Sequence, residues 1–467
     1  MGRTLFDKLW QEHLVADLGN GTGLLLIDRV LLHERTGGVA LNSLAESGHG
    51  IVAPAQVFAT MDHVVDTFPG RDDRTTMPTG TAFIQATRNA ALAAGITLFD
   101  LGDLRQGIVH VISPEQALVL PGATLVCPDS HTCSQGALGA LAWGIGSTEA
   151  EHALATATLR VKRPKTMRIT VEGVLREGVT PKDMALHILQ RLGSSGAKGH
   201  MIEYTGAAVA ALDVEERLTL CNMATEMSAF SAIIAADDTV FAYLKGRPYA
   251  PEDALWDDAV KYWRTLRSDD DAQFDAEYSF DADQVRPMVT WGVSPQQATA
   301  LGARVPAFEE VAGRDSREAY DRALAYMDLS AGDGLDLPID AAFIGSCTNS
   351  RLSDLRRAAA ILNGRKVAPG VKAIVVPGSS SVKRQAEAEG LDRIFIEAGF
   401  EWREAGCSMC FFAGGESFGP RQRVITSTNR NFESRQGPET RSHLASPETV
   451  AASAIAGHIV DPSMLGC

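Results

Sequence analysis

The sequence predicts an α/β protein in which parallel strands alternate with helices. Short β-branched runs are each followed by a turn rich in Gly, Ser, Asn or Pro and then by a helical pattern. The composition, with 45% apolar and 22% charged residues, is that of an ordinary globular protein and excludes disordered, collagen-like and coiled-coil classes. At about 150 residues per domain, a chain of 467 residues is long enough for roughly three domains.

The first of three strand–turn–helix units lies in the N-terminal third. Residues 123–126 are predicted to form a strand that ends in Cys127-Pro128-Asp129-Ser130-His131-Thr132. After a glycine-rich stretch, a capping box at 148–151 is predicted to open a helix that continues to Leu159.

The other two units lie in the C-terminal third. Residues 341–344 are a predicted strand, and 352–362 a predicted amphipathic helix closed by Asn363-Gly364. Residues 371–376 are a third strand, ended by Pro377-Gly378. In open α/β sheets, ligands bind at the carboxyl ends of strands, so we expect functional residues in these loops.

Two shifts in composition predict domain boundaries. The basic, proline-containing stretch 161–165 closes the first α/β section, and the acidic stretch 268–283 separates the middle segment from the last section. We therefore expect α/β domains at 1–165, 166–290 and 291–467. No internal repeat is visible.

Charge and cysteine content narrow the class of function. Lys and Arg number 43 against 58 Asp and Glu, a formal charge of −15, which disfavours binding to nucleic acid or anionic lipid. An anionic substrate must then be held by a few local arginines or by a metal. Apolar stretches such as 137–145 are shorter than the roughly 20 residues that span a bilayer, so we expect no membrane protein. Seven cysteines, without a signal peptide at the N-terminus, indicate a reducing cytoplasm.

Three of the cysteines stand in ligand-like settings. Cys407-Ser408-Met409-Cys410 is a CxxC element, and Cys347 follows a predicted strand. The spacing is compatible with zinc ligands, a redox dithiol, iron–sulfur ligands or unligated buried thiols. Zinc would normally recruit a second CxxC or a nearby HxxxH, and a redox dithiol would open a thioredoxin-like helix. The remaining cysteines have no partner at ligand spacing: Cys127, Cys133, Cys221 and Cys467.

Five dispersed motifs, at 60–63, 127–132, 344–350, 406–410 and 427–432, occur in the order found in the aconitase superfamily. Within it, the chain is most similar to the large subunits of bacterial isopropylmalate dehydratases, from about residue 3 to residue 460. The resemblance is supported by the segments 107–110, 402–406 and 432–437.

This resemblance implies aconitase-like three-layer α/β/α domains around a central iron–sulfur cleft. It implies one 4Fe–4S cluster held by Cys347, Cys407 and Cys410, with one iron left open as a Lewis acid. The implied activity is that of a hydro-lyase that interconverts 2-isopropylmalate and 3-isopropylmalate in leucine biosynthesis. Three alternatives remain: a dehydratase of homocitrate, citramalate or another malate derivative, an RNA-binding or iron-sensing regulator, and a structural zinc protein. The acidic charge and the full set of site residues argue against the regulator.

The resemblance also assigns roles to individual residues. Those implied to handle the departing water are carboxylate–imidazole residues, namely Asp62, His63, His110, Asp129 and His131. Those implied to bind substrate or to lie beside the cluster are Ser130, Glu203, Asn349, Asn429, Arg430 and Arg435. Arginine suits this role because its planar guanidinium holds a carboxylate bidentately and stays charged. We expect purely structural roles for the other histidines, His13, His33, His49, His152, His187, His200, His443 and His458.

Some positions depart from the family pattern. Pro128 and Ser434 stand where glycine is common, and Cys133 and Gln135 replace smaller or imidazole residues. None removes a predicted ligand, but they leave room for a different malate derivative as substrate. Because the family's catalytic serine base lies on a further swivelling domain, we expect a separate small subunit and hence a heterodimer.

Overall fold

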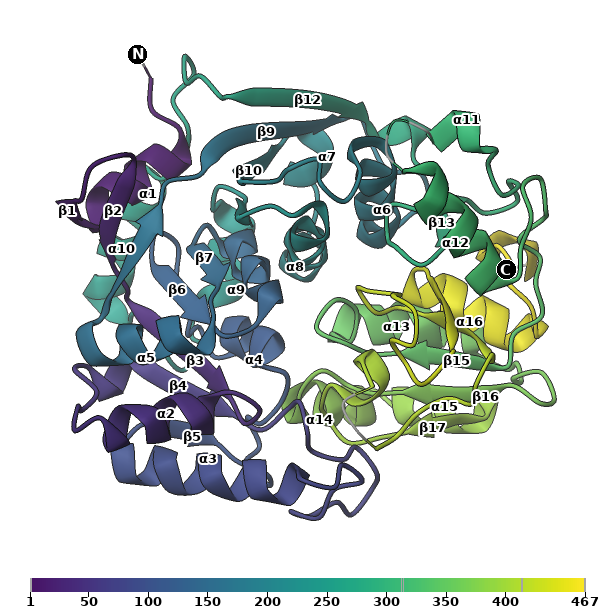
Figure 1. Cartoon of the computed structure of the whole chain (residues 1–467), viewed down its shortest axis with the longest axis horizontal. Coiled ribbons are helices and arrows are strands. Elements are labelled where there is room, and N and C mark those ends of the chain that lie inside the picture. The colour runs from purple at the N-terminus through teal and green to yellow at the C-terminus, as the bar shows by residue number, and fades with distance from the viewer. Residues whose placement is uncertain (1, 312, 314, 413–414, 466–467) are drawn as a thin grey trace. The chain divides into compact units, whose positions relative to one another are not determined.

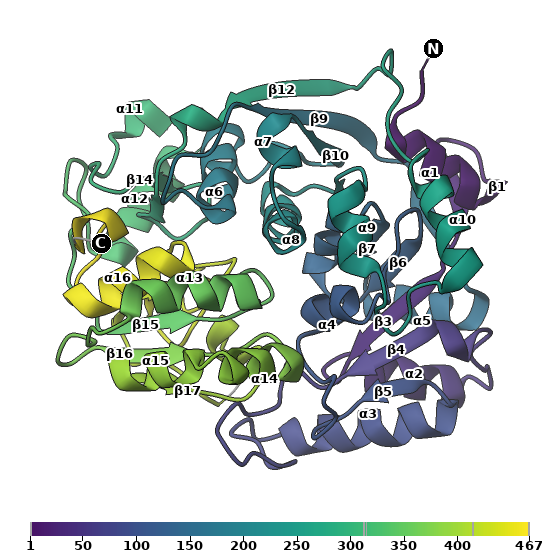
Figure 2. The ribbon, with the colours of Figure 1, turned by 180° about the vertical axis from the view of Figure 1, so that it is seen from behind.

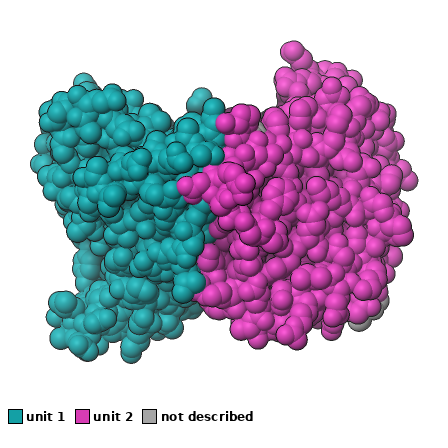
Figure 3. Space-filling view, turned by 90° about the horizontal axis from the view of Figure 1, so that it is seen from below, with its two compact units in different colours: residues 1–64, 79–173, 197–280 teal, residues 65–78, 174–196, 281–467 magenta. Residues whose placement is uncertain are grey.

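The computed structural model describes residues 2–311, 313, 315–412 and 415–465. These form two compact units, each built from several stretches of the chain (Figure 3). Unit 1 comprises residues 1–64, 79–173 and 197–280, and unit 2 comprises residues 65–78, 174–196 and 281–467.

The main sheet of unit 1 has five parallel strands in the order β5-β4-β3-β6-β7 (Figure 1). Its strands are β3 (Arg29–His33), β4 (Val57–Thr60), β5 (Thr97–Phe99), β6 (Thr124–Cys127) and β7 (Leu141–Gly144). Every residue of β4 and β6 is buried, as expected for parallel strands covered on both faces. Among the helices of this unit, α2 (Gly37–Glu46) packs against α3 (Gly80–Ala94) and α5 (Ser147–Thr156).

Two further sheets belong to unit 1. The first has the order β11-β10-β9-β12 and is made of β9 (Lys165–Glu172), β10 (His200–Thr205), β11 (Ser231–Ile233) and the largely exposed edge strand β12 (Ala276–Asp281). The second is an antiparallel sheet of β1 (Leu14–Asp17), β2 (Thr22–Leu26) and β8 (Thr158–Lys162). The remaining helices of the unit are α1 (Leu5–His13), α4 (Val109–Glu115), α7 (Ala207–Ala210), α8 (Val214–Asn222), α9 (Asp238–Leu244) and α10 (Asp253–Trp263).

Unit 2 contains a second five-stranded parallel sheet, in the order β17-β16-β15-β18-β19. Its strands are β15 (Ala341–Ile344), β16 (Lys372–Val375), β17 (Phe400–Trp402), β18 (Arg423–Thr426) and β19 (Arg441–Leu444). Helix α13 (Leu352–Leu362) packs against α16 (Pro447–Ala456), and α14 (Ser380–Ala388) packs against α15 (Leu391–Ala398) (Figure 2). The unit also holds α6 (Pro181–Leu192), α11 (Phe308–Val311), α12 (Arg317–Met327) and a hairpin of β13 (Met288–Thr290) with β14 (Ala298–Ala300).

The two large sheets share one topology. In each, the first strand is central, the next two strands lie on one side of it and the last two on the other. The order of strands therefore reverses beside β3 and beside β15, and ligands of open α/β sheets bind at such switch points. This repeat of topology is not visible as a repeat of sequence.

Several predicted elements are confirmed, including the strands beginning near 123, 341 and 371 and the helix at 352–362. The predicted helix after the glycine-rich stretch was wrong at both ends. Helix α5 is capped at Gly146, whose N–H donates to the Glu149 carboxylate over 2.8 Å, two residues before the predicted cap. It ends at Thr156 rather than Leu159, because Ala157 adopts a left-handed φ of 51° and the next residue begins β8.

The domain boundaries at 165 and 290 stay a prediction. The acidic stretch 268–283, which we expected to separate two segments, contains strand β12. Within the part of the chain that the structure describes, helices are too short or too polar to cross a bilayer.

Candidate active site

Three cysteines, Cys347, Cys407 and Cys410, follow strands β15 and β17, which lie on either side of β16 in the unit 2 sheet, and are named here the thiol group. Cys347 lies three residues beyond β15, and the other two lie in the loop that begins after β17. The Cys410 N–H donates to the Cys407 carbonyl oxygen over 2.9 Å, so these two thiols belong to one tight turn. All three are buried, with exposed fractions of 8%, 5% and 7%.

Neutral side chains contact two of the sulfur atoms. The Asn429 amide nitrogen donates to Cys347 Sγ over 3.4 Å, and its amide oxygen lies 4.0 Å from Cys410 Sγ. The Ser346 hydroxyl lies 3.1 Å from Cys410 Sγ. One amide and one hydroxyl thus link the CxxC turn to the loop after β15. Three buried thiols, two of which lie beside a side-chain amide or hydroxyl, form a donor set that suits an iron–sulfur cluster.

The loops that carry the thiols are fixed by the surrounding chain. Ser346 has a φ of 82° and Ser408 a φ of 45°, both in the left-handed region that non-glycine residues rarely adopt. Thr67 Oγ1 donates to Ser408 Oγ over 2.9 Å, and Gln436 Nε2 donates to the Met409 carbonyl over 2.8 Å. Such strained backbone persists only where its surroundings hold it, which is typical of ligand-binding sites.

The predicted substrate arginines follow β18 on the same sheet. Arg435 lies over the Phe411 ring at 5.2 Å, and its backbone carbonyl accepts the Phe412 N–H over 2.6 Å. Its buried Nε–H has no acceptor among the residues that the structure describes, so this guanidinium has a donor available for a ligand carboxylate. Arg430 lies 5.8 Å from the Phe432 ring. The predicted Asn349 donates to Asp354 over 3.0 Å at the start of α13.

The five predicted proton-handling residues, Asp62, His63, His110, Asp129 and His131, are gathered at the carboxyl end of the unit 1 sheet and are named here the imidazole–carboxylate group. His63 Nδ1 lies 2.5 Å from Asp62 Oδ1, and its Nε2 lies 3.2 Å from Asp129 Oδ2. His110, on α4, directs Nε2 at Asp129 Oδ1 over 3.0 Å.

Asp129 is the centre of this group. It caps the 3₁₀ segment Ser130–Leu138 and accepts the His131 N–H over 2.7 Å. Burial favours its neutral form, but hydrogen bonds and charge from His110, with further bonds from His131 and His63, outweigh burial and hold its pKa well below the usual range. Asp129 is therefore ionised at neutral pH and can accept hydrogen bonds from the Nε2 atoms of both His63 and His110.

Three residues that sequence reasoning missed belong to the same neighbourhood. Glu226 accepts a hydrogen bond from His131 Nε2 over 2.9 Å. His33, expected to be purely structural, stacks on His63 with ring centroids 3.9 Å apart. Glu34 accepts the N–H groups of Asp62 and Val64 over 2.9 and 2.6 Å. A usable signal existed in each case, because Glu226 interrupts a buried apolar run and His33-Glu34 ends a buried strand.

Burial shifts the pKa values of His33 and Glu34, which lie next to His63. Burial, with charge repulsion from His63, lowers the pKa of His33 to about 4, so this ring is neutral. Burial, with repulsion from Asp62, raises the pKa of Glu34 to about 7. Ligand atoms of His33, Glu34, Asp62 and His63 lie within 4.8 Å of one another. Because each carboxylate oxygen here accepts a hydrogen bond, we interpret them as a hydrogen-bond network rather than a cation site.

Not every predicted residue joins these groups. Glu203, on β10, accepts the Ser268 hydroxyl over 2.7 Å and contacts neither the histidines nor their carboxylates through any described hydrogen bond. Ser130 is exposed, and its Oγ lies 3.4 Å from His131 Nδ1.

The positions that depart from the family pattern lie at or near these groups. The Pro128 carbonyl accepts from His33 Nε2 over 3.2 Å, and Gln135 Nε2 donates to the His110 carbonyl over 3.4 Å. Cys133 is buried beside the Asn222 carbonyl, at 3.7 Å. Ser434 keeps the left-handed φ of 62° that suits the glycine it replaces.

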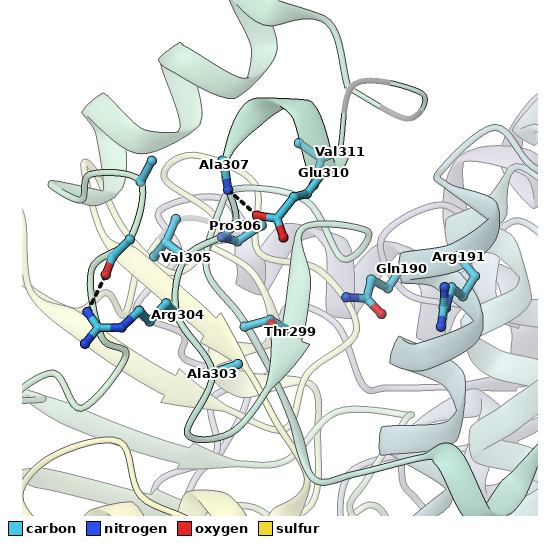
Figure 4. Close-up of a pocket in the computed structure, with 12 residues that line it drawn as sticks. Gln190, Arg191, Thr299, Ala303, Arg304, Val305, Pro306, Ala307, Glu310 and Val311 are labelled. Atoms are coloured by element: carbon cyan, nitrogen blue, oxygen red, sulfur yellow. Dashed lines mark hydrogen bonds between the residues drawn. The ribbon is translucent and has the colours of Figure 1, made fainter.

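A hollow of about 840 Å³ in unit 2 (Figure 4) has none of the predicted site residues in its lining. It is lined by the end of α6 and by residues 299–311 and 331–332. Two of its charged groups are already bonded, since Arg304 donates to the Gly332 carbonyl and Glu310 accepts the Ala307 N–H, both over 2.7 Å. No predicted residue faces it.

Comparisons with known proteins agree with the motifs. The sequence model of the aconitase family (aconitate hydratase) matches residues 7–457. The chain is 50% identical over 461 residues to a protein named 3-isopropylmalate dehydratase large subunit 1 from Bradyrhizobium diazoefficiens, covering 98% of this chain and 96% of that protein. A solved structure of Thermococcus kodakaraensis aconitase X, in its holo-form, aligns with a TM-score of 0.45 and 13% identity over 91% of this chain and 89% of that one. On the family match and on this full-length identity, the chain belongs to the aconitase family.

Proposed function

We propose that this chain is the large subunit of a hydro-lyase that interconverts 2-isopropylmalate and 3-isopropylmalate in leucine biosynthesis. The observation that carries the proposal is identity of 50% along nearly the whole chain to a relative named for that activity. The thiol group and the imidazole–carboxylate group supply donor atoms of the two kinds that such a dehydration requires.

Cys347, Cys407 and Cys410 would hold a 4Fe–4S cluster. The fit rests on three buried thiols and on donors from Ser346 and Asn429 that would stabilise thiolate charge. When bound, such a cluster with three protein ligands supplies an open Lewis-acidic iron that makes hydroxide a better leaving group.

The imidazole–carboxylate group would move the proton that accompanies the hydroxyl. Glu226 holds His131 at Nε2, and the Ser130 hydroxyl lies at its Nδ1. Asp129 holds His63 and His110 at Nε2. A carboxylate orients the imidazole it holds, so these histidines would donate a proton to the departing hydroxide and take it back.

The arginines after β18 would bind the substrate carboxylates. The available Nε–H of Arg435 is suited to a charged hydrogen bond with a carboxylate oxygen. Few local cations then suffice to hold a dianion on a chain whose formal charge is −15.

A small subunit is the proposed partner, since the curated relative is called a large subunit. We further propose that this subunit carries the base for the carbon-bound proton, that the enzyme is cytoplasmic and that it binds neither membrane nor nucleic acid. A different malate derivative remains the second candidate substrate, because Pro128 and Gln135 contact His33 and His110 and depart from the family pattern.

The test is an anaerobic assay of the iron-reconstituted chain with and without the candidate small subunit. The unsaturated intermediate is followed by ultraviolet absorbance with 2-isopropylmalate, 3-isopropylmalate, homocitrate and citramalate. We expect a brown protein, turnover only with both subunits and a preference for the isopropylmalates. A colourless protein with stoichiometric zinc would contradict the cluster, and robust turnover by the lone chain would contradict the heterodimer.

Loss of the open iron provides a second test. Air or a mild oxidant is expected to stop turnover before the fold is lost, and ferrous iron with a thiol is expected to restore it. Activity that persists with a three-iron cluster would rule out the Lewis-acid role.

A further inference from the structure

Lys182 is a buried lysine of unit 2 to which the proposed function gives no role. It lies in the first turn of α6, and its side chain is fully buried. Its ammonium donates to the backbone carbonyl oxygens of Ser427 and Thr428, over 3.0 and 2.5 Å, from a position about 245 residues away in sequence. Lysine is almost never fully buried unless its charge is matched, so this placement needs a reason.

The two carbonyls belong to the loop that carries the candidate site after β18. Ser427 is bonded to the loop after β15 through its hydroxyl, which accepts the Gly345 N–H over 3.1 Å. Asn429 directs its amide at Cys347 Sγ, and Arg430 follows directly. The loop therefore contacts the thiol group at Asn429 and is held by the Lys182 ammonium at Ser427 and Thr428.

Stability of the fold is a poor reason for this charge. Burial of an ammonium carries a large desolvation cost, and a well-packed apolar side chain of similar volume is often as stabilising or more so. The adjacent Asp183 stabilises the fold. One of its oxygens accepts hydrogen bonds from Thr180 in the helix cap, and the other accepts the Met288 N–H over 2.7 Å. Lys182 is instead directed at the candidate site.

We propose that Lys182 is a positioning residue for the reaction. Its ammonium fixes the backbone of 427–430, and with it the direction of the Asn429 amide toward sulfur and of the Arg430 guanidinium toward substrate. The inference rests on the proposed function, because its readouts are cluster and substrate signals.

The experiment compares three reconstituted complexes of the full chain with the small subunit: wild type, Lys182→Met and Asp183→Asn. Methionine is unbranched, is one heavy atom shorter than lysine and removes every donor. Asp183→Asn perturbs the same buried turn and removes the neighbouring negative charge, but keeps the Lys182 ammonium and its two carbonyl acceptors. We expect Lys182→Met to raise KM by about tenfold, because an Arg430 guanidinium that is no longer held in position would lose a charged hydrogen bond to the substrate. It should also change the visible circular dichroism of the cluster and speed amide exchange in a peptide spanning 425–432. Asp183→Asn should lower thermal stability and leave KM, spectrum and exchange near wild type.

The conservative variant Lys182→Arg keeps donors and charge, so it should recover part of the KM change. If Lys182→Met does not accumulate as folded protein, Lys182→Gln replaces it and should raise KM by a smaller factor in the same direction. Wild-type KM, spectrum and exchange in the folded variant would overturn the inference, as would equal changes in Asp183→Asn. A wild-type complex without iron, sulfide or turnover would instead overturn the proposed function, so the two failures are distinguishable.

Discussion

The two large sheets share a strand order but differ in the atoms that they present at their carboxyl ends. In unit 1 the central strand β3 ends at His33, which Glu34 follows, and the neighbouring strand β6 leads to Asp129. In unit 2 the central strand β15 leads to Ser346-Cys347, and the neighbouring strand β18 leads to Asn429. The same topology thus carries nitrogen and oxygen donors in one unit and sulfur donors in the other. Topology decides where loops meet, and the residues in the loops decide the chemistry.

The two groups are also held in different ways. Charged side chains fix one another in unit 1, where the Asp129 carboxylate accepts from His63, His110 and the His131 N–H. In unit 2 the thiols are held by strained backbone and neutral donors such as Ser346 and Asn429. The imidazole–carboxylate group is therefore held by hydrogen bonds to charged groups, and the thiol group by backbone conformation and neutral side chains.

The largest expected effect belongs to the thiol group. Serine at Cys347, Cys407 or Cys410 replaces a soft ligand with a hard one and should abolish cluster retention and turnover. Serine at Cys127, Cys133 or Cys221 should not, because burial raises the pKa of the Cys127 and Cys221 thiols far above their usual range and keeps them protonated. The measurement is the content of iron and sulfide per chain. A full cluster in a serine variant of Cys347, Cys407 or Cys410 would show that the proposed ligand set is wrong. Cys467, for which we make the same prediction, lies outside the described residues.

The next largest effect should come from Asp129→Asn. This variant tests whether the imidazole–carboxylate group can be impaired without loss of the cluster. The amide cannot hold two imidazoles as the carboxylate does, so kcat should fall by about 10²–10⁴, the usual contribution of acid–base catalysis. Iron content should stay at the wild-type value. Asp28→Asn is the matched control, since Asp28 also pairs with a histidine of unit 1, His13, at 2.9 Å. Equal losses in both variants would remove Asp129 from the proton-handling role.

A smaller effect is expected at the arginines. Arg430→Lys and Arg435→Lys keep the charge but lose the planar fork, and each should lower kcat/KM by roughly tenfold or more, because charged hydrogen bonds contribute about 1.5–3 kcal/mol. Arg322→Lys, at an exposed ion pair with Glu433, should change little. Unchanged kinetics in both test variants would return these arginines to structural roles.

The smallest effect on turnover is expected at His443. Unlike the histidines of the imidazole–carboxylate group, it contacts a backbone carbonyl and an arginine rather than a carboxylate. Its Nδ1 donates to the Thr290 carbonyl, its Nε2 accepts from Arg423, and burial together with the Arg423 charge lowers its pKa to about 3. The unfolded chain binds a proton below about pH 6.5 and the folded one does not, so this stability is present above pH 6.5 and is lost as the pH falls toward 3.

His443→Gln should therefore flatten the decline of the unfolding free energy between pH 6 and 4 by about 1.4 kcal/mol per pH unit, with kcat near wild type. Urea unfolding at several pH values, followed by tryptophan fluorescence, measures this slope. His458→Gln, at an exposed site, serves as the control. A steep slope that persists in His443→Gln would mean that other groups dominate acid unfolding.

Much of the site follows from short-range signals in the sequence. The loops after 341–344 and 123–126 were predicted because turn residues directly follow apolar runs, and the CxxC turn was predicted from the spacing of its two cysteines. The same kind of local signal gave a wrong end for α5. Ala157 adopts a left-handed conformation that ends the helix early, and alanine is not a residue type that predicts a turn.

The sequence by itself determined the alternation of strands and helices, the three candidate ligands, the carboxylate–histidine motifs and the acidic charge. These depend on residue type and on near neighbours along the chain. Only the tertiary structure decided that His131 is held by Glu226, that His33 stacks on His63, and that Lys182 supports the loop bearing Asn429. Such pairings join residues separated by about 30 to 245 positions. They are set by strand order and by burial of polar groups that must find partners, and a local pattern carries neither.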